Sequence, residues 1–238
     1  MNNKIKIFDV GIDNISLKEA KNILENILIQ KKQIKIFTPN PEILLKAEKY
    51  SEFKKILQDG DLLVPDGIGI ILMSRIFGDK FKEKITGVDL MMEICAMAEK
   101  HQKSIFFLGG RNKSAEKTSN ILKSIFSKLI ISGFSEDVDS CYNLIKDSTP
   151  NIIFVALGAP KQEVWISKNI KNFPFINIAI GVGGAFDLIS GKIKRAPLMI
   201  QRVNMEWLWR LLMEPRRILR IFNAIIIFPL KVIFYKLK

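Results

Sequence analysis

The sequence predicts an α/β fold in which helices flank a mostly parallel sheet and a basic helical appendage follows. Short apolar runs of strand length alternate with helical patterns, which is typical of buried parallel strands. Polar, glycine-bounded segments follow several of these runs, and positive charge gathers near the end of the chain. We therefore divide the chain into an α/β core over residues 1–196 and an appendage over residues 197–238.

Composition and charge narrow the class of protein. Of the 238 residues, 48% are hydrophobic and 26% are charged, as in a globular fold with a sizeable core. The formal net charge is +13, and the residues after Ser190 contribute +9 of it. This local basic surface favours a polyanionic partner: a nucleic acid, an anionic membrane or a phosphorylated substrate. The two cysteines form no CxxC motif and the N-terminus has no secretion signal, so we expect a cytoplasmic protein without a disulfide framework.

Six apolar runs are expected to form the strands of the sheet. Helical patterns separate most of them, and strand–helix–strand repeats at this spacing make right-handed crossovers in one parallel sheet. The runs cover residues 34–37, 62–64, 105–108, 129–132, 152–157 and 176–180.

Start signals place the helices between these strands. Ser16 and Glu19 form a capping box that opens a helix to about residue 30. Asn40 caps a second helix, whose first residue is a proline. Thr86 precedes the start of a third helix. The remaining helices of the core are expected to begin at Ser114, Val138 and Lys161.

The appendage combines basic, aromatic and apolar residues. Residues 199–220 are expected to be helical, with Pro215 as a start or kink. The apolar run 221–230 is interrupted by Asn223 and Pro229 and is shorter than the roughly 20 residues of a spanning helix. We expect this end of the protein to associate peripherally with an anionic membrane surface. Whether the tail lies on the membrane, embeds in it or folds over the active site is open at this point.

Four polar segments should converge on one crevice, because the carboxyl ends of parallel strands meet at one edge of a sheet. This arrangement indicates an enzyme or a ligand-binding protein. The segments are Thr38-Pro39-Asn40, Pro65-Asp66-Gly67, the run from Gly158 to Glu163, and the run from Gly181 to Asp187.

Asp66 is the candidate general base, because a carboxylate at a strand end, partly buried beneath apolar walls, gains a raised pKa. Capping of the helix that starts near Ile68 is the alternative role. Thr38 and Asn40 offer a hydroxyl and an amide that can orient a sugar, although Asn40 can also be a helix cap. Gln162 and Glu163 open a helix whose N-terminus favours anions, and capping by Glu163 is the simpler role for that residue.

Glycines after the strands allow close approach of a nucleotide to the backbone. No complete GxGxxG or P-loop motif is present, which argues against a dinucleotide-dependent oxidoreductase. The residues that we expect at the nucleotide are Gly109, Gly110, Gly158, Gly183, Gly184 and Asp187.

No metal or other cofactor is expected. Residues 59–61 and 137–139 both read D-x-D, but their positions at a turn and at a helix start favour capping roles. His101 is the only histidine, and it stands at an expected helix end. Arg210, Arg217 and Arg220 share one helical face near two tryptophans, where they can capture phosphate beside a membrane.

Taken together, these residues resemble the WecG/TagA/CpsF family of bacterial glycosyltransferases. The motifs occur in order over most of the chain, from about Phe37 to Arg220. Besides the four segments above, they are Ile85-Thr86-Gly87-Val88-Asp89-Leu90, Arg195-Ala196-Pro197, Glu206-Trp207-Leu208-Trp209-Arg210 and Glu214-Pro215-Arg216-Arg217.

The resemblance implies a Rossmann-like variant fold and an inverting, metal-independent transfer from a UDP-sugar to a polyprenyl-diphosphate-linked acceptor. N-acetylmannosamine added to lipid-linked N-acetylglucosamine, as in teichoic acid synthesis, is the reaction most typical of the family. The resemblance also implies that Asp66 is the base and that Thr38, Asn40 and Gln162 position the substrate. It assigns the appendage arginines to closure of the site at the cytoplasmic membrane face.

Lys84 departs from the family pattern, which has an arginine there. Lysine keeps the charge but lacks the bidentate fork, so its grip on a diphosphate differs. Two alternatives remain open at this point: a hexose such as glucose as donor for capsule or exopolysaccharide, and a non-catalytic nucleic-acid-binding protein. Whether the chain forms a homo-oligomer is also open.

Overall fold

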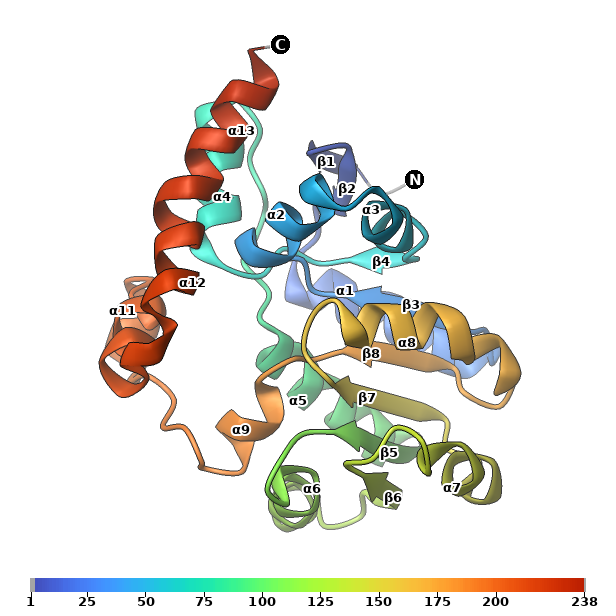
Figure 1. Cartoon of the computed structure of the whole chain (residues 1–238). Coiled ribbons are helices and arrows are strands. Elements are labelled where there is room, and N and C mark those ends of the chain that lie inside the picture. Colours follow the sequence, from blue (N-terminus) through green and yellow to red (C-terminus); the bar gives the residue numbers. More distant parts are fainter. Residues whose placement is uncertain (1–2, 238) are drawn as a thin grey trace.

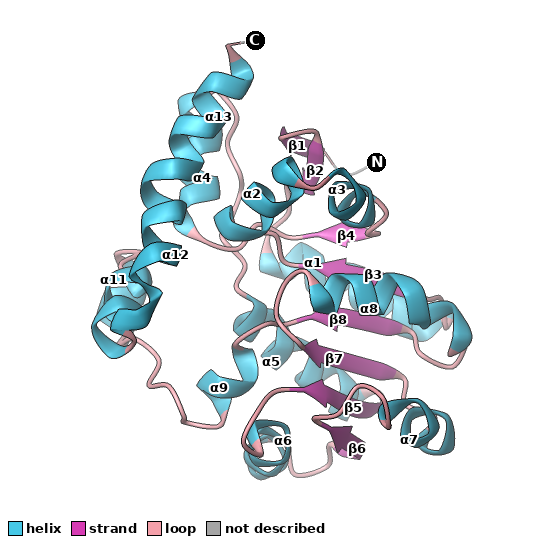
Figure 2. Ribbon diagram, in the orientation of Figure 1, coloured by secondary structure: helices cyan, strands magenta, loops and turns pink. Residues whose placement is uncertain are grey.

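The computed structural model, which describes residues 3–237, confirms the α/β fold and its parallel sheet (Figures 1 and 2). Six strands pair in the order β4-β3-β8-β7-β5-β6, and every pairing is parallel. Each of the six expected apolar runs forms one of them. The strands are β3 (Ile34–Phe37), β4 (Leu62–Leu63), β5 (Ser104–Gly109), β6 (Ile130–Ser135), β7 (Ile152–Ala156) and β8 (Ile178–Gly181).

Helices cover both faces of the sheet. Successive side chains of a strand point to opposite faces, so each face carries apolar side chains that helices bury. In β7, Ile153 and Val155 join one buried cluster, while Ile152 and Phe154 join the other. One face packs against α2 (Pro41–Lys49), α3 (Ser51–Gln58), α4 (Ile68–Ile76), α7 (Cys141–Ser148) and α8 (Lys161–Asn169). The other packs against α1 (Leu17–Gln30), α5 (Gly87–Lys100), α6 (Ser114–Ile125) and α9 (Ala185–Ile189).

The expected helix starts are confirmed with one exception. Ser16 and Glu19 form the capping box of α1, and Thr86 caps α5 through the backbone N–H of Asp89. The helix expected from Val138 begins instead at Cys141. Asp137 is the physical reason, since its carboxylate accepts the backbone N–H groups of Asp139 and Ser140 and holds them in a turn.

An N-terminal hairpin is an element that the sequence prediction missed, as are helices α3 and α9. Strands β1 (Lys4–Ile7) and β2 (Val10–Asp13) pair antiparallel, and their two-residue turn, Phe8-Asp9, has positive φ at both positions. Phe8 is buried in edge-to-face contact with Phe228 and Tyr235 near the C-terminus. The hairpin therefore joins the two ends of the chain.

The appendage is helical over most of residues 199–220, as expected, and Pro215 begins its last helix. It forms α10 (Leu198–Arg202) and α11 (Glu206–Met213), separated by a turn in which Asn204 has a left-handed φ of 59°. One continuous helix of 22 residues then runs from Pro215 to Lys236. It consists of η2 (Pro215–Arg217), α12 (Ile218–Phe222), the wider π-helical turn η3 (Asn223–Ile227) and α13 (Phe228–Lys236).

This long helix corrects the expectation that Asn223 and Pro229 interrupt it. The wider turn that ends at Ile227, two residues before Pro229, accommodates a residue without a backbone N–H, so the helix continues. By length and composition alone the helix is sufficient to cross a membrane, and most of it is exposed in the structure. Figure 1 shows α13 running beside α4, while α11 and α12 stand opposite the strand ends.

Candidate active site

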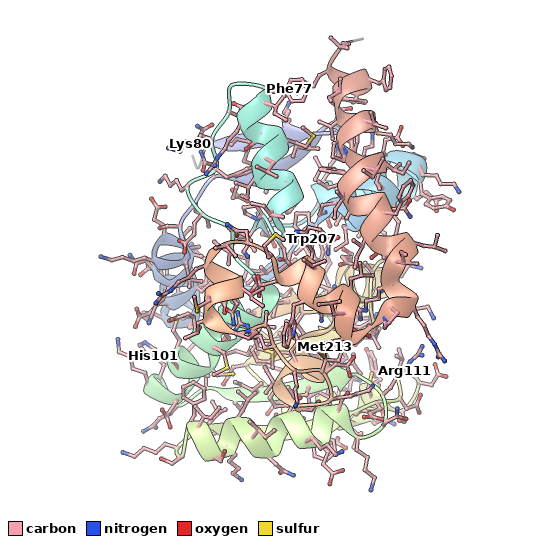
Figure 3. All side chains as sticks on the ribbon, turned by 90° about the vertical axis from the view of Figure 1, so that its left-hand side faces the viewer. Phe77, Lys80, His101, Arg111, Trp207 and Met213 are labelled. Atoms are coloured by element: carbon pink, nitrogen blue, oxygen red, sulfur yellow. The ribbon has the colours of Figure 1, made fainter. Side chains whose placement is uncertain are left out.

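One cavity of about 390 Å³ lies at the carboxyl ends of β4, β3, β8 and β7, between the core and the appendage. All eight residues that we expected to catalyse or to bind substrate line it. They are Thr38, Asn40, Asp66, Lys84, Gln162, Arg210, Arg217 and Arg220. In Figure 3 the appendage faces the viewer, and Trp207, which also lines the cavity, lies near the centre of the view.

Asp66 does not cap the following helix. Gly67, with a φ of 96°, occupies the cap position of α4, and no side chain caps that helix. The backbone N–H of Asp66 donates to Pro39 O at 3.0 Å, which ties the loop after β4 to the loop after β3. The Asp66 carboxyl is therefore left to face the cavity.

Burial raises the pKa of Asp66 to about 7. Desolvation is the largest cause, and Lys84 and Arg210 oppose it because their positive charges favour the carboxylate. Glu206 and Asp89 raise the pKa further by repulsion. A carboxyl with a pKa near neutrality can accept a proton from a hydroxyl that it contacts and can release it again.

The loop after β3 supplies polar groups on one wall. The Thr38 hydroxyl donates to Gly181 O at 3.2 Å, so this residue also links β3 to the end of β8. Asn40 Oδ1 accepts the backbone N–H of Ile43 at 3.0 Å, which confirms its role as the cap of α2. Asn40 also lines the cavity, so its capping role leaves it within reach of a ligand there.

Gln162 links the first turn of α8 to the loop after β8. Its Oε1 accepts the backbone N–H of Gly183 at 3.0 Å, and its Nε2 donates to Glu163 Oε1 at 2.8 Å. Gly183 and Gly184 of this loop line the cavity, and a side chain on Gly184 would lie 3.3 Å from the guanidinium of Arg210.

Six cationic side chains line this cavity: Lys84, Lys194, Arg195, Arg210, Arg217 and Arg220. Acidic residues pair with four of them, and Arg195 Nη2 lies 2.6 Å from Asp89 Oδ1. Lys84 Nζ lies 2.7 Å from Glu206 Oε2, Arg217 Nε lies 2.9 Å from Glu214 Oε2, and Arg220 Nε lies 3.8 Å from Glu42 Oε1. Arg210 differs, since its buried Nη2 has no hydrogen-bond partner within the described residues. Burial lowers the pKa of Arg210, and repulsion from Arg217 adds to the effect.

The expected nucleotide-binding residues divide into two groups. Gly158, Gly183 and Gly184 line the cavity. Gly109, Gly110 and Asp187 do not line it, although they stand at the same edge of the sheet. A side chain on Gly110 would meet Ser114 and Phe186, and Asp187 pairs with Lys192 at 3.1 Å.

The two D-x-D segments make turn and ion-pair contacts. Asp61 accepts the backbone N–H of Lys35, and Asp137 closes the turn before α7. His101 ends α5 and contacts Glu25 at 2.7 Å. Among residues 3–237 there is no group of three or more His, Cys, Asp or Glu side chains that could hold a metal ion.

Sequence reasoning missed the acids of the cavity. Glu206 and Glu42 line it and pair with Lys84 and Arg220, but neither was expected to act there. Glu42 carried a usable signal, because it stands two residues after Asn40 and one helical turn before Lys46. Glu206 lies in a family motif, but only the folded chain shows that it faces Lys84.

Sequence comparisons support an enzyme of sugar transfer. A model of the glycosyl transferase WecG/TagA/CpsF family matches residues 5–238. A relative from Bacillus spizizenii is 37% identical over 194 residues, which are 80% of this chain and 75% of the relative. A relative from Bacillus subtilis is 34% identical, over 89% of this chain and 84% of its own length.

A third relative, from Staphylococcus aureus strain MW2, is 28% identical over 96% of this chain and 92% of its own. All three are named N-acetylglucosaminyldiphosphoundecaprenol N-acetyl-beta-D-mannosaminyltransferase. The match of the family model over nearly the whole chain, together with these relatives, shows that the chain belongs to the WecG/TagA/CpsF family of glycosyltransferases.

Proposed function

We propose that this enzyme transfers N-acetylmannosamine from a UDP-sugar to polyprenyl-diphosphate-linked N-acetylglucosamine, with inversion and without a metal, in the synthesis of teichoic acid or a similar surface polysaccharide. One observation carries the proposal: a carboxyl with a pKa near 7 and six cationic side chains line the same cavity. The names of the relatives supply the sugar and the acceptor.

Asp66 is the proposed general base. Its carboxylate takes the proton of the acceptor hydroxyl, whose oxygen attacks the anomeric carbon of the donor from the side opposite UDP. The bond from that carbon to the UDP oxygen breaks, and UDP carries away the electron pair. A base with a pKa close to the working pH combines a large deprotonated fraction with useful basicity.

The cations of the cavity are the proposed counter-charges for the departing diphosphate. Arg210 is already desolvated and has an unpartnered donor, so it can bind an anion without first breaking an ion pair. Lys84, Arg217 and Arg220 must exchange Glu206, Glu214 and Glu42 for phosphate oxygens. Such preorganised charge stabilises a leaving group in a water-poor site.

We place the enzyme on the cytoplasmic face of the membrane as a peripheral protein. The core side of α13 is docked: Phe228 and Val232 are buried, Lys231 pairs with Glu48 at 2.8 Å, and Tyr235 donates to Asp9. Its outer side exposes large apolar residues beside those of α4, and these can enter the headgroup region. The exposed residues are Leu72, Ile76, Leu230, Phe234 and Leu237.

Release of UDP tests the function. The purified protein receives a panel of UDP-sugars and a soluble prenyl-diphosphate-N-acetylglucosamine analogue, with and without EDTA. The proposal predicts acceptor-dependent UDP release from UDP-N-acetylmannosamine that EDTA leaves unchanged. Release from UDP-glucose alone would replace the sugar, loss of activity in EDTA would overturn the metal-free mechanism, and absence of release from every donor would contradict the proposed reaction.

A further inference from the structure

Glu163 is a buried carboxyl to which the proposed mechanism gives no task. It is the third residue of α8, and its side chain has no solvent exposure. Oε1 accepts a hydrogen bond from Gln162, whereas Oε2 is buried without a partner among the described residues. Burial raises its pKa to about 7, against the lowering effects of Gln162 and of Lys46 on α2. A half-satisfied buried acid lowers stability, so capping alone does not account for its position.

The contact with Glu163 fixes which way the Gln162 amide points. A carboxyl oxygen without a proton only accepts hydrogen bonds, so the amide nitrogen must face Glu163. The amide oxygen is thereby directed to the backbone N–H of Gly183, which it accepts at 3.0 Å. Close packing restricts the amide further, because a side chain on Gly181 would lie 2.8 Å from Gln162 Nε2.

The backbone that Gln162 holds is a wall of the cavity. Gly183 and Gly184 line it directly, and Gly183 has a left-handed φ of 52°. The same loop begins at Gly181, whose carbonyl accepts the Thr38 hydroxyl. A chain of contacts therefore runs from Glu163 through Gln162 to the loop after β8.

We infer that Glu163 is a positioning residue: it orients the Gln162 amide and thereby sets the Gly181–Gly184 loop for the substrate. The inference deepens the proposed function and rests on it, since it takes Gln162 and this loop to contact the substrate. An amide oxygen can replace Oε1 as the acceptor, whereas a thioether of similar size cannot do so effectively. The two substitutions Glu163→Gln and Glu163→Met therefore distinguish the loss of the hydrogen-bond acceptor from a change in side-chain volume.

Steady-state kinetics test the inference with a matched control. Glu116 occupies the same third position of α6 and makes no side-chain hydrogen bond within the described residues, so Glu116→Met controls for loss of a first-turn acid. We expect Glu163→Met to lower kcat/KM for the donor by about 10- to 100-fold and Glu163→Gln to stay within about fivefold of the native enzyme. Glu116→Met should leave it unchanged.

Stability distinguishes positioning from a purely structural role. Replacing a half-satisfied buried acid by an apolar residue is expected to leave the melting temperature of Glu163→Met equal or higher. A loss of activity that parallels a fall in melting temperature would overturn the inference. So would equal losses in Glu163→Gln and Glu163→Met, or an independent, additive loss when Glu163→Met is placed in a Gln162→Met background.

An NMR measurement makes the result independent of turnover. The side-chain amide signals of Gln162, assigned by their disappearance in Gln162→Met, should be shifted and slow to exchange in the native protein and in Glu163→Gln. In Glu163→Met they should move to the positions of a free amide. Unchanged signals in Glu163→Met would refute the contact, whereas changed signals without turnover of any UDP-sugar would place the failure in the proposed function.

Discussion

The core and the appendage contribute to the same cavity in different ways. The core side brings Thr38, Asn40 and Asp66 from strand ends that stand on buried, close-packed clusters. In the appendage, Phe228 and Val232 are the buried residues between 198 and 237, and α11 has none. The arginines nevertheless come from this thinly packed part of the chain.

The contrast suggests a division of labour. A base must meet the reacting hydroxyl within hydrogen-bond reach, and a rigid strand end provides that precision. A positive charge stabilises the diphosphate over longer distances than a hydrogen bond requires. The arginines can therefore stand on the appendage, a thinly packed element that can move to admit a large lipid-linked substrate. Each of the following experiments tests this difference between the core and the appendage.

The largest effect is expected from Asp66→Asn, which removes the base and retains the shape of the side chain. Turnover should fall by about 10²- to 10⁴-fold, because proton removal from the acceptor is lost. Initial-rate measurements at saturating donor and acceptor check this. Normal turnover would remove Asp66 from the mechanism and with it the claim that the core supplies the base.

Arg210→Met should have the next largest effect, a fall in kcat/KM of about 10²- to 10³-fold, as for the loss of one preorganised donor. Arg202→Met is the matched control, because Arg202 is an exposed arginine of the appendage that does not line the cavity. It should retain native kinetics with a soluble acceptor. Equal losses in the two variants would indicate a general effect of charge instead of a specific contact.

Activity and stability are expected to change in opposite directions with pH. Asp66 must be deprotonated to act, so the rate should fall about tenfold per unit as pH drops below about 7. The raised pKa means that the folded protein binds more protons than the unfolded chain between about pH 4 and 7. Stability should therefore rise as pH falls through this window, with a melting temperature several degrees higher at pH 5.5 than at pH 8.

Asp66→Asn should flatten part of that stability profile, and Glu163 accounts for the remainder of the expected slope. Scanning calorimetry across this range measures the effect. A native protein that loses stability between pH 8 and pH 5.5, with no smaller slope in Asp66→Asn, would contradict the raised pKa values.

Glu206→Gln should have a smaller effect, of a few fold, on nucleotide affinity. Removing the carboxylate frees Lys84 from its partner, so UDP no longer competes with an internal anion and should bind about two- to fivefold more tightly. Titration calorimetry with UDP checks this. Weaker binding would show that Glu206 holds Lys84 in place for the ligand instead of occupying its position.

The smallest effect on chemistry is expected from the outer face of α13. Phe234→Ser with Leu237→Ser removes exposed apolar surface, so binding to anionic vesicles should fall several-fold in a sedimentation assay. Turnover of a soluble acceptor should remain unchanged. Undiminished vesicle binding would exclude this face as the membrane contact.

The structure of the core could be predicted from the sequence more fully than that of the appendage. Apolar runs determine the core strands because each is buried on both faces, and capping residues such as Ser16 and Thr86 determine helix starts locally. The alternation Lys4-Ile5-Lys6-Ile7 marked the first strand of the hairpin, but the turn at Phe8-Asp9 lacks the usual glycine or asparagine.

Local patterns were least informative in the appendage. The break at Asn204 and the continuation through Pro229 depend on backbone conformations that no periodicity encodes. The catalytic and substrate-binding candidates lay at strand ends or in motifs and converge on the cavity. The pairing of Lys84 with Glu206 requires two segments 122 residues apart to meet, so only the folded chain shows it.

Calorimetric titration of UDP into Asp66→Asn and Arg210→Met, side by side with the native protein, tests the division of labour most directly. If the core supplies the base and Arg210 of the appendage supplies charge for the diphosphate, Asp66→Asn should bind UDP within about threefold of the native affinity or more tightly. Arg210→Met should bind at least about tenfold more weakly. Weak binding by Asp66→Asn together with native affinity in Arg210→Met would contradict the account.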